Sequence, residues 1–138
     1  MTNLDTPFNC LCAGLRRAAR IASRQYDQAL APIGINVQQF TALVTLNELG
    51  PTTVTQLAQS LELERTAATR NLAVMEKAGL IKRREGEDRR ERVVEITAEG
   101  RKRLNNARPM WRNAQRDLID KMGEPIADSL LQKLDSIA

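Results

Sequence analysis

The residues whose types and spacing could do chemistry lie on one side of a predicted helix over residues 65–77. When residues 65–79 are placed on a helical wheel at about 100° per residue, the other side is apolar or small, and it carries Ala68, Leu72, Met75 and Gly79. The polar and cationic side carries Arg65, Thr66, Thr69, Arg70 and Ala73. Small side chains let a helix approach the floor of a DNA groove, and arginine can donate two hydrogen bonds to guanine or to a phosphate. A solvated helix face has the same pattern, so both interpretations stay open at this point.

A dense charge run follows this helix. Residues 82–92 read KRREGEDRRER, with six cations and four anions in eleven residues. Extended segments at 80–84 and 92–96 flank the charged turn, which predicts a β-hairpin. The tip of such a hairpin can reach a minor groove, where arginine meets a concentrated negative potential. The candidate DNA-binding residues of this hairpin are Arg84, Asp88, Arg89, Arg90 and Arg92. Because phosphate would repel Asp88, we expect Asp88 to pair with a neighbouring arginine and to fix the shape of the tip.

Composition supports a nucleic-acid partner and excludes several kinds of site. The 138 residues suffice for one compact unit, and 21 Lys and Arg against 17 Asp and Glu give a net charge of +4. Five of these cations are lysines and sixteen are arginines, whose planar fork fits phosphate and base edges. The absence of histidine excludes His-dependent triads and His-ligated zinc. The four aromatic residues lie outside the basic runs, unlike the stacking platforms that bind single strands.

The sequence predicts neither a catalytic site nor a membrane-spanning segment. Glu62, Glu64 and Glu76 have the spacing of ordinary helix charges, and no glycine-rich nucleotide-binding motif is present. We expect a protein that is not an enzyme, with no cofactor and no metal site. The sequence has no apolar run of about 20 residues and no secretory signal, so we expect a cytoplasmic chain without a membrane partner. A module used for protein interaction would present an apolar face with few cations, which residues 65–73 do not.

The stretches that position the candidate residues are predicted to be mainly helical. Capping boxes at Asn36 with Gln39 and at Thr53 with Gln56 mark two helix starts. Apolar residues at three- and four-residue steps predict helices over residues 7–31, 37–49, 54–60, 65–77, 98–121 and 126–137. A short helix, a tight turn, a second helix and a hairpin form a winged helix-turn-helix. We therefore predict a mainly α fold with a small β-hairpin wing and flanking dimerisation helices.

The run LELERTAATRNLAVMEKAGLIKRREGEDRRERVVEITAEG, residues 61–100, resembles the DNA-binding core of the MarR family of winged-helix regulators. The resemblance covers Asn36 to about Leu104, and it includes the AGLI turn, the DRR of the wing tip and the TAEG helix start. It implies a double-stranded-DNA-binding transcriptional regulator, a repressor released by a small-molecule, thiol or metal signal. It further implies major-groove contacts by Arg65, Thr66, Thr69 and Arg70, and wing contacts by Arg89 and Arg90. Thr53, Thr55 and Gln56 would brace the sugar–phosphate backbone.

The flanking helices are predicted to join two copies of the chain. The long helix has an apolar stripe at near-heptad spacing, made of Leu104, Ala107, Trp111, Ala114, Leu118 and Met122. Such stripes often pack within one chain, but we favour a seam between subunits, as the resemblance also implies. A twofold dimer places two recognition helices about 34 Å apart on a near-palindromic site.

Pro109 should bend the long helix, either as a packing kink or to set that spacing. The expected units are a dimerisation helix (1–35), the winged helix-turn-helix domain (36–100) and dimerisation helices (101–138), all in one compact chain.

The sequence leaves two kinds of signal open for releasing the regulator from DNA. Cys10 and Cys12 could respond to an oxidant or a soft metal. In a helix, however, side chains at positions i and i+2 are separated by about 200° around the axis, so the two sulfurs would point in opposite directions. Buried, inert cysteines in a helix are the commoner case. The alternative is a small aromatic effector, with plausible pocket neighbours at Arg16, Arg17, Tyr26, Trp111 and Arg112, which the sequence does not bring together.

Overall fold

The computed structural model describes residues 1–138 as six α-helices and a three-stranded antiparallel sheet. The helices are α1 (Leu11–Leu30), α2 (Val37–Leu49), α3 (Val54–Ser60), α4 (Arg65–Lys77), α5 (Ala98–Met122) and α6 (Glu124–Asp135). The strands are β1 (Thr52–Thr53), β2 (Ile81–Glu85) and β3 (Arg92–Ile96), in the order β1-β3-β2. Two 3-10 helices, η1 (Pro7–Asn9) and η2 (Ala31–Ile33), precede and follow α1. The mainly α fold with a hairpin wing is confirmed.

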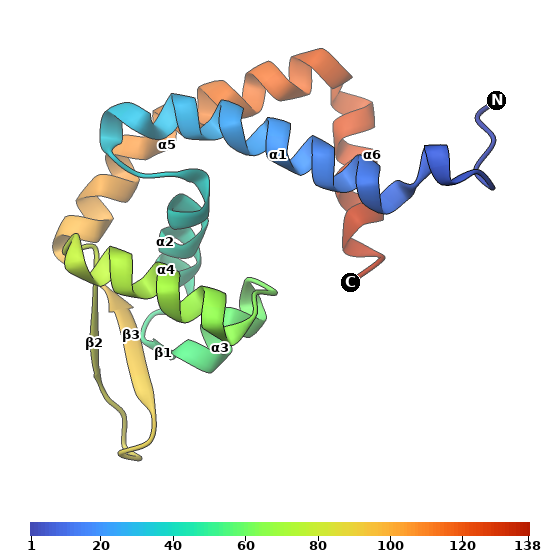
Figure 1. Ribbon diagram of the computed structural model, residues 1–138. Coiled ribbons are helices and arrows are strands. Elements are labelled where there is room, and N and C mark those ends of the chain that lie inside the picture. Colours follow the sequence, from blue (N-terminus) through green and yellow to red (C-terminus); the bar gives the residue numbers. More distant parts are fainter.

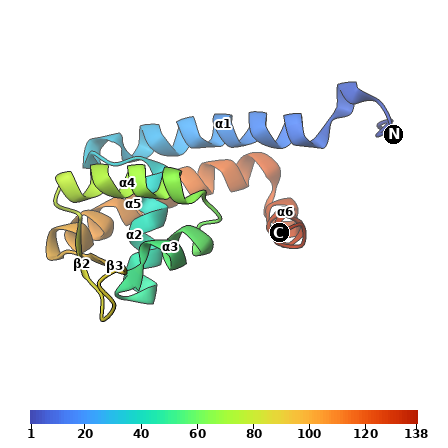
Figure 2. The same cartoon turned by 60° about the horizontal axis from the view of Figure 1, so that its bottom comes forward.

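The molecule has two parts that share one core. In Figure 1, α1 and α5 lie side by side along the top, and α2, α3, α4 and the hairpin lie below them. Figure 2 shows the same arrangement, with the start of α1 and α6 extending beyond the rest of the fold. The buried cluster draws on every layer: Leu30 of α1, Leu43 and Leu46 of α2, Leu72 and Met75 of α4, Ile81 of β2, Val94 of β3, and Leu104 and Ala107 of α5. α4 and the hairpin are therefore anchored to α1 and α5 by packing in this common core.

The local signals for helix starts are confirmed. Asn36 and Gln39 form both hydrogen bonds of a capping box, and so do Thr53 and Gln56. The Thr97 hydroxyl accepts a hydrogen bond from the Gly100 N–H at 3.0 Å and caps α5. No single helix is long and apolar enough to cross a membrane; segments 7–33 and 37–49 reach that composition only together, across a 73° bend.

Two local predictions need correction. The first α-helix begins at Leu11 instead of at Thr6–Pro7, because the chain becomes extended at Cys10, with ψ of 119°. Residues 7–9 form only a 3-10 turn capped by Thr6. The third strand, β1, was not predicted, since its two residues are too few to form a pattern and it exists only through pairing with Val93 and Val94 of β3.

The apolar stripe of α5 is mostly covered within one chain, so its assignment to a seam between subunits is wrong for most of its length. Leu104 and Ala107 are fully buried and Ala114 is nearly so. The Trp111 ring stacks on that of Phe40 in α2, with centroids 5.8 Å apart. The physical reason is that α5 crosses both α1 and α2. α5 continues as a helix through Pro109 and changes direction along its length (Figure 1).

We predict that Gly100→Ala destabilises the junction between the wing and α5. A Cβ on Gly100 would lie 2.1 Å from the Leu80 carbonyl oxygen and 2.8 Å from a side-chain carbon of Ile96. Relief of this overlap should cost about 1–3 kcal/mol, measured by urea unfolding. The control Asn106→Ala lies on the exposed side of the same helix and should stabilise the protein by about 0.5 kcal/mol. Equal stability of the two variants would contradict the close approach.

Candidate nucleic-acid interface

The exposed face of α4 is the one that the sequence predicts. Ala68, Leu72 and Met75 are buried, so the helix is anchored by its apolar side. A shallow hollow on its outer side is lined by Arg65, Thr66, Thr69, Arg70 and Ala73. These five residues are all exposed. Helical periodicity thus brings two guanidinium groups and two hydroxyls onto a single open surface.

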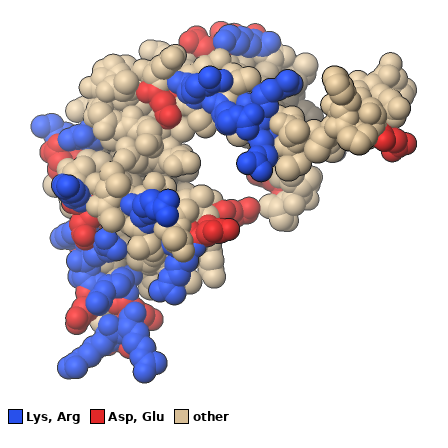
Figure 3. Space-filling model, viewed as in Figure 1, with Lys and Arg blue, Asp and Glu red and all other residues tan.

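The hairpin carries cations away from the body of the protein. In Figure 3, cationic side chains project from the free end of the hairpin and also lie over α4. The tip turn is held by backbone hydrogen bonds, with the Glu91 N–H donating to the Asp88 carbonyl oxygen at 2.9 Å. The Asp88 carboxylate accepts from the backbone N–H of Arg90 at 3.0 Å. The expected pairing of Asp88 with an arginine side chain is therefore wrong: Asp88 shapes the tip through the backbone, since that N–H lies two residues away.

Ion pairs divide the arginines of this surface into two groups. On the strands, Lys82 and Arg84 lie 3.2 and 3.9 Å from Glu95, and Arg92 lies 3.9 Å from Glu85. These exposed pairs are weak, at about 0–1 kcal/mol each, so they orient Arg84 and Arg92 without neutralising them fully. Arg65, Arg70, Arg89 and Arg90 take part in none of the ion pairs. Four guanidinium groups are thus free to bind an anionic partner.

A hollow of about 330 Å³ between α3, α4 and the wing brings together residues from all three elements. It is lined by Thr53, Val54, Thr55, Arg65, Thr69, Arg83, Arg90, Glu91 and Arg92. We call it the arginine hollow. Six of the twelve predicted site residues therefore converge: Thr53, Thr55, Arg65, Thr69, Arg90 and Arg92. Gln56 does not line it, and its side-chain oxygen accepts from the Thr52 hydroxyl at 2.9 Å and from the Thr53 N–H at 3.2 Å.

Sequence reasoning missed three residues that line the arginine hollow, Val54, Arg83 and Glu91, and it missed Glu76, which binds Arg83. Arg83 donates two hydrogen bonds to the Glu76 carboxylate, from Nε at 3.1 Å and from Nη2 at 3.3 Å. Glu76 was interpreted as an ordinary helix charge. The strand alternation carries a usable signal, because Arg83 is two residues from the buried Ile81 and so faces α4, unlike Lys82 and Arg84.

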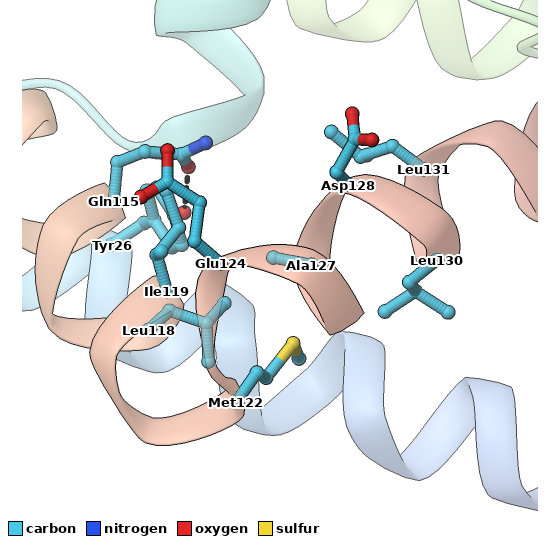
Figure 4. Close-up of a pocket in the computed structure, with 10 residues that line it drawn as sticks. All are labelled: Tyr26, Gln115, Leu118, Ile119, Met122, Glu124, Ala127, Asp128, Leu130 and Leu131. Atoms are coloured by element: carbon cyan, nitrogen blue, oxygen red, sulfur yellow. Dashed lines mark hydrogen bonds between the residues drawn. The ribbon is translucent and has the colours of Figure 1, made fainter.

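A second, mostly apolar pocket of about 300 Å³ lies far from this surface, between α5 and α6 next to α1 (Figure 4). Leu118, Met122 and Leu130 line it, and the Tyr26 hydroxyl donates a hydrogen bond to Gln115 at its edge. Burial raises the pKa of Tyr26 above its ordinary value of 10.0. Of the five residues considered for an aromatic effector, only Tyr26 lines this pocket.

The cysteines differ from the expected inert pair. Both Cys10 and Cys12 are exposed in the single chain, so burial does not protect them. Cys10 is the residue before α1 and has an extended backbone, so the 200° separation expected within a helix does not apply. No group of three or more metal-ligating side chains is assembled anywhere in the structure.

A helix-turn-helix followed by a hairpin that carries cations defines the chain as a winged helix-turn-helix protein. The family model of the MarR family matches residues 35–91. The M. tuberculosis transcriptional regulator MosR, in a crystal structure with DNA, is 35% identical, with 93% of this chain and 98% of MosR covered and a TM-score of 0.79. The chain belongs to the MarR family.

Two Bacillus subtilis proteins are similar in sequence over a shorter region. The HTH-type transcriptional regulator YwoH is 32% identical over 64% of this chain and 65% of its own length. The organic hydroperoxide resistance transcriptional regulator is 34% identical over 67% of this chain and 63% of its own length. The chain thus matches just under two thirds of each. The family and these relatives are transcriptional regulators and not enzymes, as predicted.

Proposed function

We propose that the protein is a transcriptional repressor that binds a near-palindromic double-stranded DNA site as a homodimer and is released by a chemical signal. The observation that carries this proposal is the set of four arginines, on α4 and at the wing tip, that have no carboxylate partner. MosR, which is 35% identical over nearly its whole chain, has been crystallised with DNA. Such a protein would act in the cytoplasm, where the DNA of a bacterium lies.

The proposed contacts follow from the shape of the surface. α4 would enter the major groove with Arg65, Thr66, Thr69 and Arg70, where small residues permit close approach. Arg89 and Arg90 would enter the neighbouring minor groove. Backbone phosphates would be bound around the arginine hollow by Thr53, Thr55, Arg84 and Arg92, and at α3 by the free amide N–H groups of Gln56. Asp88 would support these contacts by holding the tip turn.

Support for a homodimer comes from apolar side chains that stay exposed in one chain. Phe8, Leu11 and Leu15 project from η1 and the first half of α1, and Leu130 and Leu131 project from α6. The apolar pocket between α5 and α6 is of a kind that such side chains fill (Figure 4). A large exposed apolar surface marks an interaction site, and two copies would cover each other in a closed twofold arrangement.

Charge complementarity favours a second copy over an unrelated partner. α1 carries four exposed arginines that form no ion pair within the chain: Arg16, Arg17, Arg20 and Arg24. The end of α5 and α6 have an acidic excess, because three cations, Arg116, Lys121 and Lys133, stand against five carboxylates that are equally free of such pairs: Asp117, Asp120, Glu124, Asp128 and Asp135. Opposite charges on these surfaces would orient α1 of one copy along α5 and α6 of the other.

The proposed signal acts on Cys10 or Cys12. Both thiols are exposed, and they lie beside Phe8 and Leu11 in the proposed interface. An organic hydroperoxide would oxidise a thiol to a sulfenic acid while being reduced to an alcohol, and one relative is named for resistance to such compounds. A soft metal bound by the thiols is the alternative thiol signal. A small aromatic effector is the rival without thiol chemistry.

We predict that Arg70→Ala weakens binding to the preferred duplex by about 1–3 kcal/mol if Arg70 reads a base. The site would be selected from a random duplex pool, and affinity measured by fluorescence anisotropy. Parent binding should fall with salt at a log–log slope of about −0.9 per phosphate contacted. Arg116→Ala, the same change on the far half of α5, is the control. Equal weakening on every duplex would make Arg70 a phosphate contact, and a parent that binds no duplex at low salt would refute the function.

The homodimer is tested by Leu131→Glu. Light scattering should give twice the chain mass for the parent and a single chain mass for this variant, because a carboxylate cannot be buried in an apolar seam without a partner. Leu49→Glu is a matched control, since Leu49 at the end of α2 is 53% exposed and Leu131 is 58% exposed. A monomeric parent, or a dimeric Leu131→Glu variant, contradicts this interface.

For the thiol signal, the double variant Cys10→Ser, Cys12→Ser should stay on DNA under an organic hydroperoxide that releases the parent. Dithiothreitol should restore parent binding, because sulfenic acids and disulfides are reversible. The measurement is an electrophoretic mobility shift with and without oxidant, repeated with zinc and with salicylate as a model aromatic acid. If the double variant is released by the same challenges as the parent, the cysteines are not the sensor.

A further inference from the structure

One ion pair connects the recognition helix directly to the wing. Arg83 on β2 donates to both carboxylate oxygens of Glu76 on α4, at 3.1 and 3.3 Å. Two parallel hydrogen bonds fix the orientation of both groups more firmly than a single contact does. The Arg83 side chain is only 25% exposed, less than the cations in the other wing pairs. Among the ion pairs of the wing, this pair therefore has the least exposed cation and two hydrogen bonds.

The Glu76–Arg83 pair attaches a side of the wing that the other contacts do not hold. At its base, the Thr97 hydroxyl donates to the Gly79 carbonyl oxygen at 2.6 Å. On one side, β3 pairs with β1. β2 is the edge strand on the other side, and beyond the buried Ile81 its inner face continues with Arg83 and then the exposed Glu85. The Glu76–Arg83 pair is thus the outermost tie between α4 and β2.

The same pair borders the proposed DNA-binding surface. Arg83 lines the arginine hollow together with Arg65 and Thr69 of α4 and Arg90 of the wing tip. Three arginines, Arg65, Arg90 and Arg92, line the hollow with it against one carboxylate, Glu91, so an unpaired Arg83 would meet a net repulsion there. Glu76 cancels this charge and keeps Arg83 between the two DNA-contacting elements.

We propose that Glu76 is a positioning residue, which holds Arg83 and thereby fixes the angle between α4 and the wing. This inference rests on the proposed function, since that angle matters only when two grooves are engaged together. A wing held at the bound angle before DNA arrives loses less conformational freedom on binding. Glu76 thus raises affinity for DNA although its own charge is negative.

The sign of the effect separates positioning from simple electrostatics. A carboxylate close to DNA repels phosphate, so removal of a passive Glu76 should tighten binding to every duplex. If Glu76 positions the wing, its removal should weaken binding despite the gain in net positive charge.

The experiment compares Glu76→Gln with Glu99→Gln on the selected duplex. Glu99→Gln makes the same charge change and breaks the Arg103–Glu99 pair, at 3.4 Å, on α5. Glu76→Gln should bind on the order of tenfold more weakly than the control and lose hydroxyl-radical protection where the wing contacts the minor groove. Protection of guanine N7 by α4 should persist. Thermal unfolding of the two variants should coincide, and Arg83→Gln should add little to Glu76→Gln.

Each outcome decides between the two claims. If the parent binds DNA and Glu76→Gln binds as tightly as the control with an unchanged footprint, the positioning role is overturned and the proposed function stands. If Glu76→Gln and Arg83→Gln weaken binding additively, the two residues act separately and the positioning role is likewise overturned. A parent that binds no duplex overturns the proposed function, and this inference falls with it.

Discussion

The arginine hollow concentrates positive charge on one side of the protein, and the packing beneath it has to offset the resulting repulsion. Arg65, Arg83, Arg90 and Arg92 line one small hollow with a single carboxylate, Glu91, among its lining residues. At physiological salt, charges closer than about 8 Å are poorly screened, so these groups must be held together by packing. Leu72 and Met75, 2% and 0% exposed, provide that packing beneath α4, and burial of each such side chain contributes about 1.5–3 kcal/mol. A polyanion would relieve the repulsion that the core sustains.

Much of this surface could be predicted from the sequence, because its determinants are local. The division of α4 into a buried and an exposed side follows from spacing alone, and the five residues that the sequence assigns to its polar side line one hollow. The starts of α2 and α3 follow from capping boxes whose hydrogen bonds form within four residues. The hairpin follows from two extended runs around a charged turn, and its strands begin and end within a residue of the expected positions.

What could not be predicted depends on partners distant in the sequence or on choices among equivalent donors. The Glu76–Arg83 pair joins a helix to a strand, and its charges look like any others in a basic run. Asp88 is followed in the sequence by two arginines, yet it accepts from a backbone N–H, which needs no long side chain to be ordered. The stripe on α5 shows that periodicity identifies a buried face without naming what buries it. Phe40 of the same chain stacks on Trp111 there.

The shared core limits how a signal at the start of α1 can act on the proposed DNA contacts. Leu30 at the end of α1 and Met75 of α4 belong to one fully buried cluster, so α4 cannot move far within its own chain without opening that cluster. The start of α1, by contrast, is exposed over residues 11–21. In the proposed dimer, a change at Cys10 or Cys12 therefore acts on the contact between two chains while each chain keeps its fold. The two copies of α4, about 34 Å apart, must match successive turns of the duplex. A small rotation at the contact between the chains is therefore enough to disengage both.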